Sequence, residues 1–360
     1  MIRVAFDTTP MYLGSGGVAT YTRELRDALR AHAEVDLVEL SHGGSSSNSP
    51  TKRIVGGLDR ELRWYRGGLE RAARSAQADV IHVPASLAAS SSALPLVLTV
   101  HDAIPWRHPE WFTSINAQYQ QRLMGRASRA ATRITTDSKA SATDITTLLG
   151  VQESRIDIAY AGISREFTPS LRAPEWLCER FNLTSPVILS VGTPEPRKNL
   201  STVLRTYERV VSQLPKASLL LVGGHGWRND ELDAAIARCP GRVIRAGHVS
   251  FSDLTRVYAS ADCFLFPSLM EGFGFPPLEA MASGLPVVCS NRPSLPEVVD
   301  SAAIICDPLD DRSLSEACLS TLSDSETREA LRRAGLTQAG HFTWEATAEL
   351  TVASYRRAMA

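Results

Sequence analysis

The chain has 360 residues, of which 44% are hydrophobic and 21% charged, and its formal net charge is −1. This length exceeds what one ordinary core needs and predicts two domains of a globular protein. The near-neutral charge argues against a general nucleic-acid-binding protein.

The six cysteines form no C-x-x-C pair, which argues against a zinc site and against a disulfide framework. The apolar runs reach about half the length of a membrane span. The first residues are typical of a strand and lack the features of a signal peptide. We therefore expect a cytoplasmic protein with reduced cysteines.

Strand-like and helix-like segments alternate from the N-terminus onward. Short apolar runs predict strands over residues 3–7, 35–40, 79–83, 96–100 and 133–136, and residues 18–30 predict a helix. Such alternation is typical of a parallel sheet with helices on both faces. The Ser- and Gly-rich segment 41–57 predicts a mobile loop, either an acceptor-binding lid or plain disorder.

The same pattern starts again after Thr168 and Pro169. Strands are predicted over residues 187–191, 219–222, 243–245, 263–266, 286–289 and 303–305, and a helix over residues 200–214. The fold class is therefore α/β with two Rossmann-like domains, an N-terminal one over 1–168 and a C-terminal one over 169–342. The final helix, 343–360, is a candidate for packing back on the N-terminal domain.

Two glutamates eight positions apart mark the strongest chemical motif, EGFGFPPLEA, directly after the predicted strand 263–266. Glycines after a strand let backbone N–H groups point at an anion. Pro276 and Pro277 predict a helix start with Glu279 in its first turn, and a helix N-terminus suits a phosphate. Glu271 lies in the loop, where its carboxylate can accept hydrogen bonds from sugar hydroxyls.

A second motif, GTPEPRKNL, contains the adjacent cations Arg197 and Lys198 between a strand and a helix. In a parallel sheet this is the carboxyl edge, where ligands bind. Two cations at that place predict a site that neutralises a departing diphosphate. Gly192 opens the same loop.

A third motif is glycine-rich and includes Gly16 and Gly17 directly before a helix. It fits the dinucleotide pattern G-x-G-x-x-A, with Glu39 as a candidate ribose ligand. Residues 8–13 separate its first glycine from the strand, however, so a flexible loop that reaches toward a phosphate fits better.

A fourth motif places His101 and Asp102 at the carboxyl end of strand 96–100, a position suited to an active site. No two aspartates are separated by a single residue, so a D-x-D metal–diphosphate clamp is absent from the sequence. The charge of a leaving diphosphate would then be met by cations and amides, without a metal or another cofactor.

Together these motifs resemble the retaining glycosyltransferases of GT-B fold, in particular family 4, over nearly the whole chain. Glu271 and Glu279 match the family's E-x7-E motif, and His101 matches its active-site histidine. Arg197 and Lys198 match its basic pair. Gly16 and Gly17 match its N-terminal glycine loop, and TVHDAIPWRHPEWF and GTPEPRKNL look most like the mannosyltransferases of surface polysaccharide assembly. At the start of the stretch SLPEV, Pro293 and Ser294 stand where the family usually has glycines.

The resemblance implies a nucleotide-sugar donor bound in an interdomain cleft. His101, Arg197, Lys198 and Glu271 would carry the catalysis. The donor would also contact a further set of residues, namely Gly16, Gly17, Gly192, Val249, Phe273, Gly274 and Glu279, and Tyr21 and Asp102 are the candidates for acceptor binding. Transfer would retain the anomeric configuration, the leaving phosphate oxygen taking the acceptor's proton.

The resemblance thus implies a metal-independent hexosyltransferase that moves a sugar, with mannose from GDP-mannose as the first choice and UDP and dTDP sugars as the alternative donors, to a glycan, a lipid-linked acceptor or a small molecule. An NAD-dependent dehydrogenase and a non-catalytic carbohydrate-binding module of the same fold are the alternatives. Arg122, Arg126, Arg129 and Arg133 have helical spacing and predict peripheral contact with an anionic membrane, to which arginines at 60, 63, 66, 71 and 74 would add charge.

Overall fold

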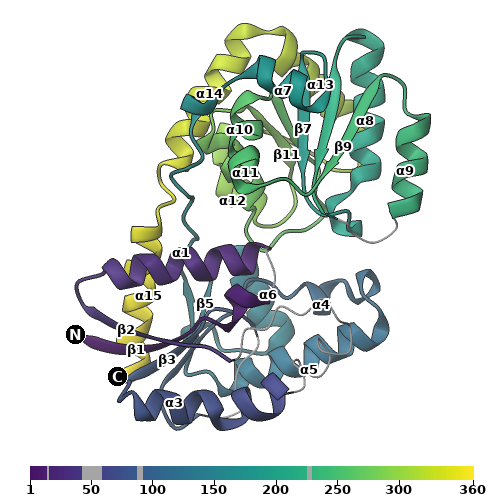
Figure 1. Cartoon of the computed structure of the whole chain (residues 1–360). Coiled ribbons are helices and arrows are strands. Elements are labelled where there is room, and N and C mark those ends of the chain that lie inside the picture. The colour runs from purple at the N-terminus through teal and green to yellow at the C-terminus, as the bar shows by residue number, and fades with distance from the viewer. Residues whose placement is uncertain (14–15, 43–58, 87–91, 225–228) are drawn as a thin grey trace. The chain divides into compact units, whose positions relative to one another are not determined.

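The computed structural model describes residues 1–13, 16–42, 59–86, 92–224 and 229–360, and the chain forms two compact units (Figure 1). Unit 1 comprises Met1–Gly162 and Thr343–Ala360, and unit 2 comprises Ile163–Phe342. The division falls after Gly162 rather than after Thr168, because Phe167 packs against Phe251 and Tyr258 of unit 2. Residues 43–57, on which the lid interpretation rests, lie outside the described residues.

Unit 1 contains a six-stranded parallel sheet in the order β2-β1-β3-β4-β5-β6. Its strands are β1 (Ile2–Asp7), β2 (Val35–Leu40), β3 (Val80–Val83), β4 (Leu96–Thr99), β5 (Arg133–Thr136) and β6 (Ile156–Ile158). β3 and β4 are buried along their whole length, as expected for a parallel sheet covered on both faces. The sequence patterns miss β6, whose three residues are only partly buried.

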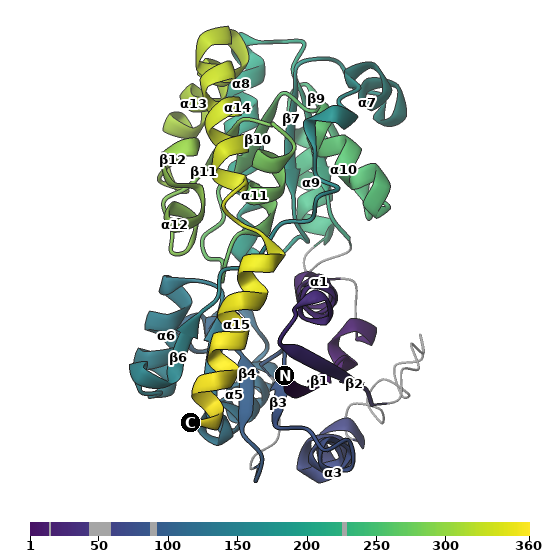
Figure 2. The same cartoon turned by 90° about the vertical axis from the view of Figure 1, so that its left-hand side faces the viewer.

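Helices cover both faces of this sheet. They are α1 (Gly17–Ala31), the π-helical segment η2 (Arg60–Gly68), α3 (Leu69–Ser75), α4 (Ile104–Arg107), α5 (Ser114–Ala130), α6 (Lys139–Leu149) and α15 (Trp344–Met359). α3, α5 and α6 contribute to one apolar core with the strands. On the opposite face α15 packs against β3 to β6 and against α1, and Figure 2 shows it in yellow across the strands.

The prediction that Arg133 shares a helical stripe with Arg122, Arg126 and Arg129 is wrong. α5 ends at Ala130, and Arg133 begins β5 instead. Its guanidinium forms a two-pronged ion pair with Asp157 on β6, with Nε–Oδ2 and Nη2–Oδ1 distances of 2.9 and 2.6 Å. Arg133 therefore links β5 to β6 by an ion pair.

Unit 2 repeats the architecture with a second six-stranded parallel sheet, in the order β12-β11-β10-β7-β8-β9. Its strands are β7 (Val187–Val191), β8 (Ser218–Val222), β9 (Arg242–Gly247), β10 (Cys263–Phe266), β11 (Val287–Ser290) and β12 (Ile304–Cys306). β7 and β10 match the predicted ranges, because each is an apolar run buried on both faces.

The helices of unit 2 are α7 (Pro174–Phe181), α8 (Leu200–Gln213), α9 (Asn229–Arg238), α10 (Phe251–Ser260), α11 (Phe275–Ala282), α12 (Leu295–Val299), α13 (Asp311–Ser323) and α14 (Ser325–Ala339). α8 and α13 form the apolar core on one face of the sheet. On the other face Tyr258 of α10 packs against Phe264 of β10. Among the helices of the described residues, none is long and apolar enough to cross a membrane.

Asp157 generates a prediction about stability. Besides Arg133, its carboxylate accepts a hydrogen bond from Ser354 of α15 (2.7 Å) and lies 2.9 Å from the Arg357 guanidinium. Burial opposes ionisation, but Arg133 and Ser354 outweigh it and hold the pKa of Asp157 below its ordinary value. Asp157→Asn should cost unit 1 about 3–5 kcal/mol, the range for removing one partner of a buried pair.

Amide hydrogen exchange in β5, β6 and α15 measures this loss locally. Because the pKa is depressed in the folded chain, the contribution should be complete above about pH 5 and lost as the pH falls below about 4. Asp36→Asn is the control, since Asp36 forms an exposed pair with Arg3 at 3.5 Å. Equal protection in both variants would contradict the prediction.

Candidate active site

The sheet of unit 2 has a point where its strand order reverses. The chain moves outward from β7 to β8 and β9, then returns to the other side of β7 with β10. Ligands of such folds bind outside the carboxyl ends of the two strands that flank the reversal. These ends lead here into the loops that carry Arg197 and Lys198 after β7, and Glu271 after β10.

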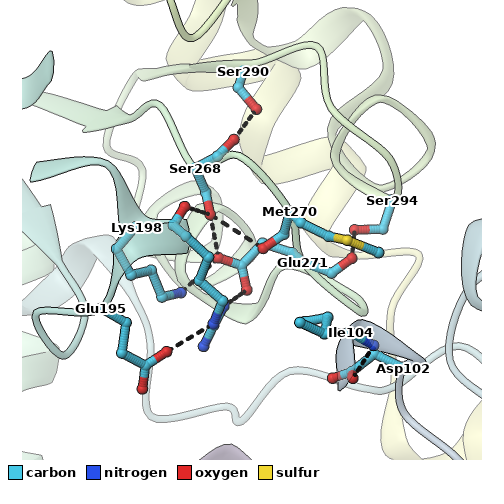
Figure 3. Close-up of polar contacts among 10 residues, drawn as sticks. Asp102, Ile104, Glu195, Lys198, Ser268, Met270, Glu271, Ser290 and Ser294 are labelled. Atoms are coloured by element: carbon cyan, nitrogen blue, oxygen red, sulfur yellow. Dashed lines mark hydrogen bonds and ion pairs between the residues drawn. The ribbon is translucent and has the colours of Figure 1, made fainter. Parts of the chain in front are cut away.

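These three side chains form one charged cluster (Figure 3). Lys198 Nζ lies 2.6 Å from Glu271 Oε1, and Arg197 Nη1 lies 2.6 Å from Glu271 Oε2. Arg197 Nε also donates to Glu195 Oε2 at 2.8 Å. Lys198 and Glu271 are each 8% exposed, whereas the Arg197 side chain is 25% exposed. The cluster therefore brings two cations and two carboxylates together beside the strand reversal.

Polar side chains that the sequence analysis missed fix the two loops. Ser268 Oγ donates to Glu271 Oε1 at 2.6 Å, and the Leu269 N–H donates to the Arg197 carbonyl at 2.7 Å. Asn199 Nδ2 donates to the carbonyl of Pro267 at 3.1 Å. Ser294 Oγ, from the stretch that departs from the family pattern, donates to the Glu271 carbonyl at 3.0 Å. In the sequence, the one signal for Asn199 is that it follows the basic pair, and the one signal for Ser268 is that it lies close to Glu271.

Gly192 gives Lys198 room to reach Glu271. It has a φ of +158°, and a Cβ there would lie 3.2 Å from Cδ and Cε of Lys198, so a side chain would crowd the lysine stem. The Lys198 ammonium lies 4.7 Å from the centre of the Phe266 ring, a cation–π contact. The structure therefore places Gly192 beneath the lysine of the cluster.

Burial and charge pairing act against each other in this cluster. Burial alone would raise the pKa of Glu271, but Arg197 and Lys198 lower that pKa to about 2. Burial lowers the pKa of Lys198, and Glu271 opposes that shift. Glu271 is thus ionised near pH 7 and pairs with both cations, and an added phosphate would compete with it for them. Glu271 Oε1 already accepts from Lys198 and Ser268, whereas Oε2 accepts from Arg197 and keeps a lone pair for a ligand hydroxyl.

The sequence analysis placed Glu279 in the first turn of a helix. The residue does lie in α11, but beyond the first turn. The helix starts at Phe275 and has no acidic residue in its first turn. Gly274 is its N-cap with a φ of +116°, a conformation that favours glycine, and a Cβ there would lie 2.7 Å from Leu295 Cδ2. The Glu279 carboxylate accepts a hydrogen bond from Tyr258 OH (2.8 Å), and burial raises its pKa to about 7.

Two other predicted donor residues of unit 2 lie near the same edge. The Phe273 ring is buried against Phe275 and Phe342, with centroid distances of 5.1 and 5.8 Å, so its side chain serves packing. Val249 follows β9, two strands from β7, and is partly buried. The structure thus brings together Arg197, Lys198 and Glu271 but not Val249.

Unit 1 holds the remaining predicted residues at the carboxyl edge of its own sheet. His101 follows β4, and its Nδ1 lies 2.8 Å from Oδ2 of Asp137, a residue that the sequence analysis missed. Tyr21 was expected to bind an acceptor, but it is 1% exposed and its ring packs edge-on against His101. Asp102 Oδ1 accepts a hydrogen bond from the Ile104 N–H at 3.0 Å, which begins α4.

The N-terminal glycines lie at the start of α1. Gly16 is the N-cap, Gly17 is the first helical residue, and a Cβ at either would meet open space. The first-turn amides of a helix lack intrahelical partners, so this end can receive an anion. Glu39, the ribose ligand of the dehydrogenase interpretation, is instead ion-paired with Arg30.

Across the part of the chain that the structure describes, no group of three or more His, Cys, Asp or Glu side chains could hold a metal ion. The cysteines of this part are free thiols.

Comparison with known proteins places both units in one family. Residues 15–167 match the model named Glycosyltransferase Family 4, and residues 179–338 match the model named Glycosyl transferases group 1. O-antigen chain mannosyltransferase B of Escherichia coli is 30% identical, over 99% of this chain and 100% of the relative.

Solved structures share the fold over nearly the whole chain. Sucrose-phosphate synthase from Thermosynechococcus elongatus has a TM-score of 0.75 at 19% identity, covering 99% of this chain and 98% of its own. HepE from Anabaena, in complex with UDP-glucose, has a TM-score of 0.73 at 18% identity, covering 98% of this chain and 99% of its own. With its two parallel sheets and these relatives, the chain belongs to glycosyltransferase family 4, has the GT-B fold and is mannosyltransferase-like.

Proposed function

We propose that this glycosyltransferase moves a mannosyl unit from GDP-mannose to a glycan acceptor, with retention of anomeric configuration and without a metal ion. The observation that carries the proposal is the ion cluster of Arg197, Lys198 and Glu271 beside the strand reversal of unit 2. It holds two cations at the place where folds of this class bind ligands.

The cluster suits a reaction in which negative charge develops on a leaving diphosphate. Cations held in place before the reaction stabilise such charge without reorganising during the reaction. In the proposed step the acceptor oxygen bonds to the anomeric carbon as the bond from that carbon to the phosphate oxygen breaks. The departing oxygen takes the acceptor's proton, so no separate base is needed. Glu271 would accept a hydrogen bond from a sugar hydroxyl through the remaining lone pair of Oε2.

The other predicted residues receive roles around this step. Glu279 would bind ribose hydroxyls, and the backbone near Phe273, Gly274 and Val249 would contact the donor. Gly16 and Gly17 would bring helix N-terminal amides to phosphate, as helix starts do in other anion sites. His101 would contact the transferred sugar.

The choice of sugar and acceptor comes from the relative's name. A 30% identical protein of Escherichia coli that spans the whole chain is an O-antigen chain mannosyltransferase, which supports mannose as the sugar and a glycan as the acceptor. The dehydrogenase alternative loses support because Glu39 is engaged by Arg30. The basic pair and both glutamates are present, which favours an enzyme over a non-catalytic module.

We also propose that α5 docks on an anionic membrane surface. Arg122, Arg126 and Arg129 are exposed, and within the described residues none of the three forms an ion pair. Ile115 and Tyr119 lie on the same helical stripe and are 84% and 43% exposed. A stripe with an apolar start and three cations complements a lipid surface with negative head groups.

The first prediction from this function concerns donor, stereochemistry and metal together. In buffer with EDTA, GDP-mannose should raise the thermal midpoint more than UDP-glucose or dTDP-glucose, because only a ligand of the folded state stabilises it. With a mannose-terminated glycan acceptor, the product should have the α-configuration by NMR. Activity that EDTA abolishes and Mg²⁺ or Mn²⁺ restores would refute metal independence, and a β-linked product would refute retention.

The second prediction concerns the basic pair. Arg197→Ala and Lys198→Ala should each lower kcat by about 10²–10³-fold, or about 2.7–4 kcal/mol, the usual cost of losing one donor to a developing negative charge. Lys216→Ala is the matched control, since Lys216 is an exposed cation of the same unit. The measurement is kcat from steady-state kinetics with the donor identified above. An unchanged kcat in both variants would contradict a phosphate-binding role for the basic pair.

The third prediction concerns the membrane. Vesicles containing phosphatidylglycerol should sediment the protein, and binding should fade as salt rises, because exposed charges are screened within about 8 Å at physiological ionic strength. Replacing Arg122, Arg126 and Arg129 by Ala should weaken binding by about 10²-fold, at roughly 1 kcal/mol for each cation.

Two controls make the vesicle assay specific. Neutral phosphatidylcholine vesicles should recover little protein. A variant with Ala at Arg312 and Arg333, which are exposed, and at Arg332, which is partly exposed, should bind as the wild type does, since all three lie in unit 2. Equal recovery with neutral and anionic vesicles would leave the α5 stripe as ordinary solvated surface.

A further inference from the structure

His101 and Asp137 come together through the register of two neighbouring strands. β4 and β5 are parallel, with Thr99 opposite Thr135. His101 and Asp137 each lie two residues beyond these partners, so they meet at the carboxyl edge of the sheet. His101 Nδ1 lies 2.8 Å from Asp137 Oδ2, and the two side chains are 14% and 2% exposed.

The surrounding structure holds the histidine in one orientation. The Tyr21 ring packs edge-on against the imidazole at a centroid distance of 4.6 Å, and Trp344 packs against Tyr21 at 5.5 Å. Ser141 Oγ donates to the His101 carbonyl at 2.7 Å. The ring is therefore held by a buried carboxylate, an aromatic neighbour and its own backbone.

One polar atom of the imidazole is left for another group. His101 Nε2 is buried and makes no hydrogen bond of acceptable geometry, although the Pro84 carbonyl is near enough to affect the ring's ionisation. An imidazole whose Nδ1–H donates to a carboxylate has a fixed tautomer, and only Nε2 can then meet a ligand. A buried polar atom without a partner costs free energy, so its retention suggests a partner that arrives with the substrate.

We propose that Asp137 is a positioning residue for sugar transfer, which keeps Nδ1 of His101 protonated and presents Nε2 to a hydroxyl of the transferred sugar. The proposal rests on the proposed function, in which His101 contacts that sugar. Asp137 hydrogen-bonds to the histidine and acts through it.

The charges that face His101 favour its protonated form. Burial lowers the pKa of His101, but Asp137 and, more weakly, Asp102 raise it above its ordinary value. The other titratable neighbours are Tyr21 on α1 and His82 on β3. Burial raises the pKa of Tyr21 and lowers that of His82 to about 3, so both are neutral near pH 7. Asp137 is thus the main charge that the histidine meets.

The wild-type protein gives the first test, by NMR of ¹⁵N-labelled histidine with His101 assigned by comparison with His101→Gln. We expect Nδ1 of His101 to stay protonated across the titration, with a pKa above about 6.5. In Asp137→Asn that pKa should fall by about 1–3 units, since a carboxylate at this distance favours the charged form. Wild-type His101 in the tautomer with the proton only on Nε2 would overturn the proposal without any variant.

Kinetics gives the second readout. Asp137→Asn should lower kcat by about 10²-fold or more with little change in KM, because a wrong tautomer misdirects the ring but leaves substrate binding intact. The pH profile of kcat should shift toward lower pH, in the direction of the histidine titration. Unchanged kcat and an unchanged profile would contradict a positioning role.

A matched control separates positioning from simple loss of a buried charge. Asp144 is also buried, is ion-paired with Arg107 and forms no hydrogen bond with a histidine in the described structure. Asp144→Asn should leave the His101 titration as in the wild type. If Asp137→Asn alters neither tautomer nor pKa, the inference fails while the proposed function stands. If it alters both but His101→Gln transfers sugar at the wild-type rate, the proposed role of His101 fails.

Discussion

The charge of Glu271 constrains the loops that follow β7 and β10 at the carboxyl edge of the sheet in unit 2. A carboxylate that is only 8% exposed would cost several kcal/mol unless partners compensate it. Lys198 and Arg197 supply that compensation from a different strand's loop. The Leu269 N–H and the Asn199 side chain connect the two loops, each by donating to a backbone carbonyl of the other loop. Removing one partner would leave a buried charge, so the loops after β7 and β10 must keep a single arrangement. A rigid pair of cations is the result, and rigidity is what stabilisation of a developing charge requires.

The same geometric rule operates in unit 1 with different chemistry. Neighbouring parallel strands end at one edge, so residues at equal distances beyond paired positions become neighbours. In unit 1 this rule brings His101 to Asp137, and in unit 2 the loops that follow the paired strands β7 and β10 bring a lysine and an arginine to a glutamate. Both clusters are local to their own sheets. Each therefore depends on strand register, and a one-residue slip in either sheet would separate the partners.

Much of this fold can be predicted from the sequence, because strands buried on both faces are plain apolar runs. β7 and β10 have the predicted bounds, whereas β6 is short, partly buried and without such a run. Local patterns also indicated the basic pair and Glu271. They could not indicate Asp137, which lies 36 residues from His101 and reaches it only through strand pairing. Arg133 belongs to the correctly predicted strand 133–136, but its spacing also fits a helical stripe, and its pairing with Asp157 is visible only in three dimensions.

The two glutamates of the E-x7-E motif illustrate why a motif alone does not determine a charge. Glu271 faces two cations, which lower its pKa to about 2. Burial raises the pKa of Glu279 to about 7, and its hydrogen bond from Tyr258 only partly opposes that shift. Near pH 7 a glutamate side chain is thus ionised at position 271 and close to its titration midpoint at position 279. The Tyr258 hydroxyl donates a hydrogen bond to Glu279, and a hydrogen bond of this kind favours the ionised form against the cost of burial. The spacing of the motif places both carboxyl groups on one loop–helix segment, and the packing around each carboxyl group sets its protonation state.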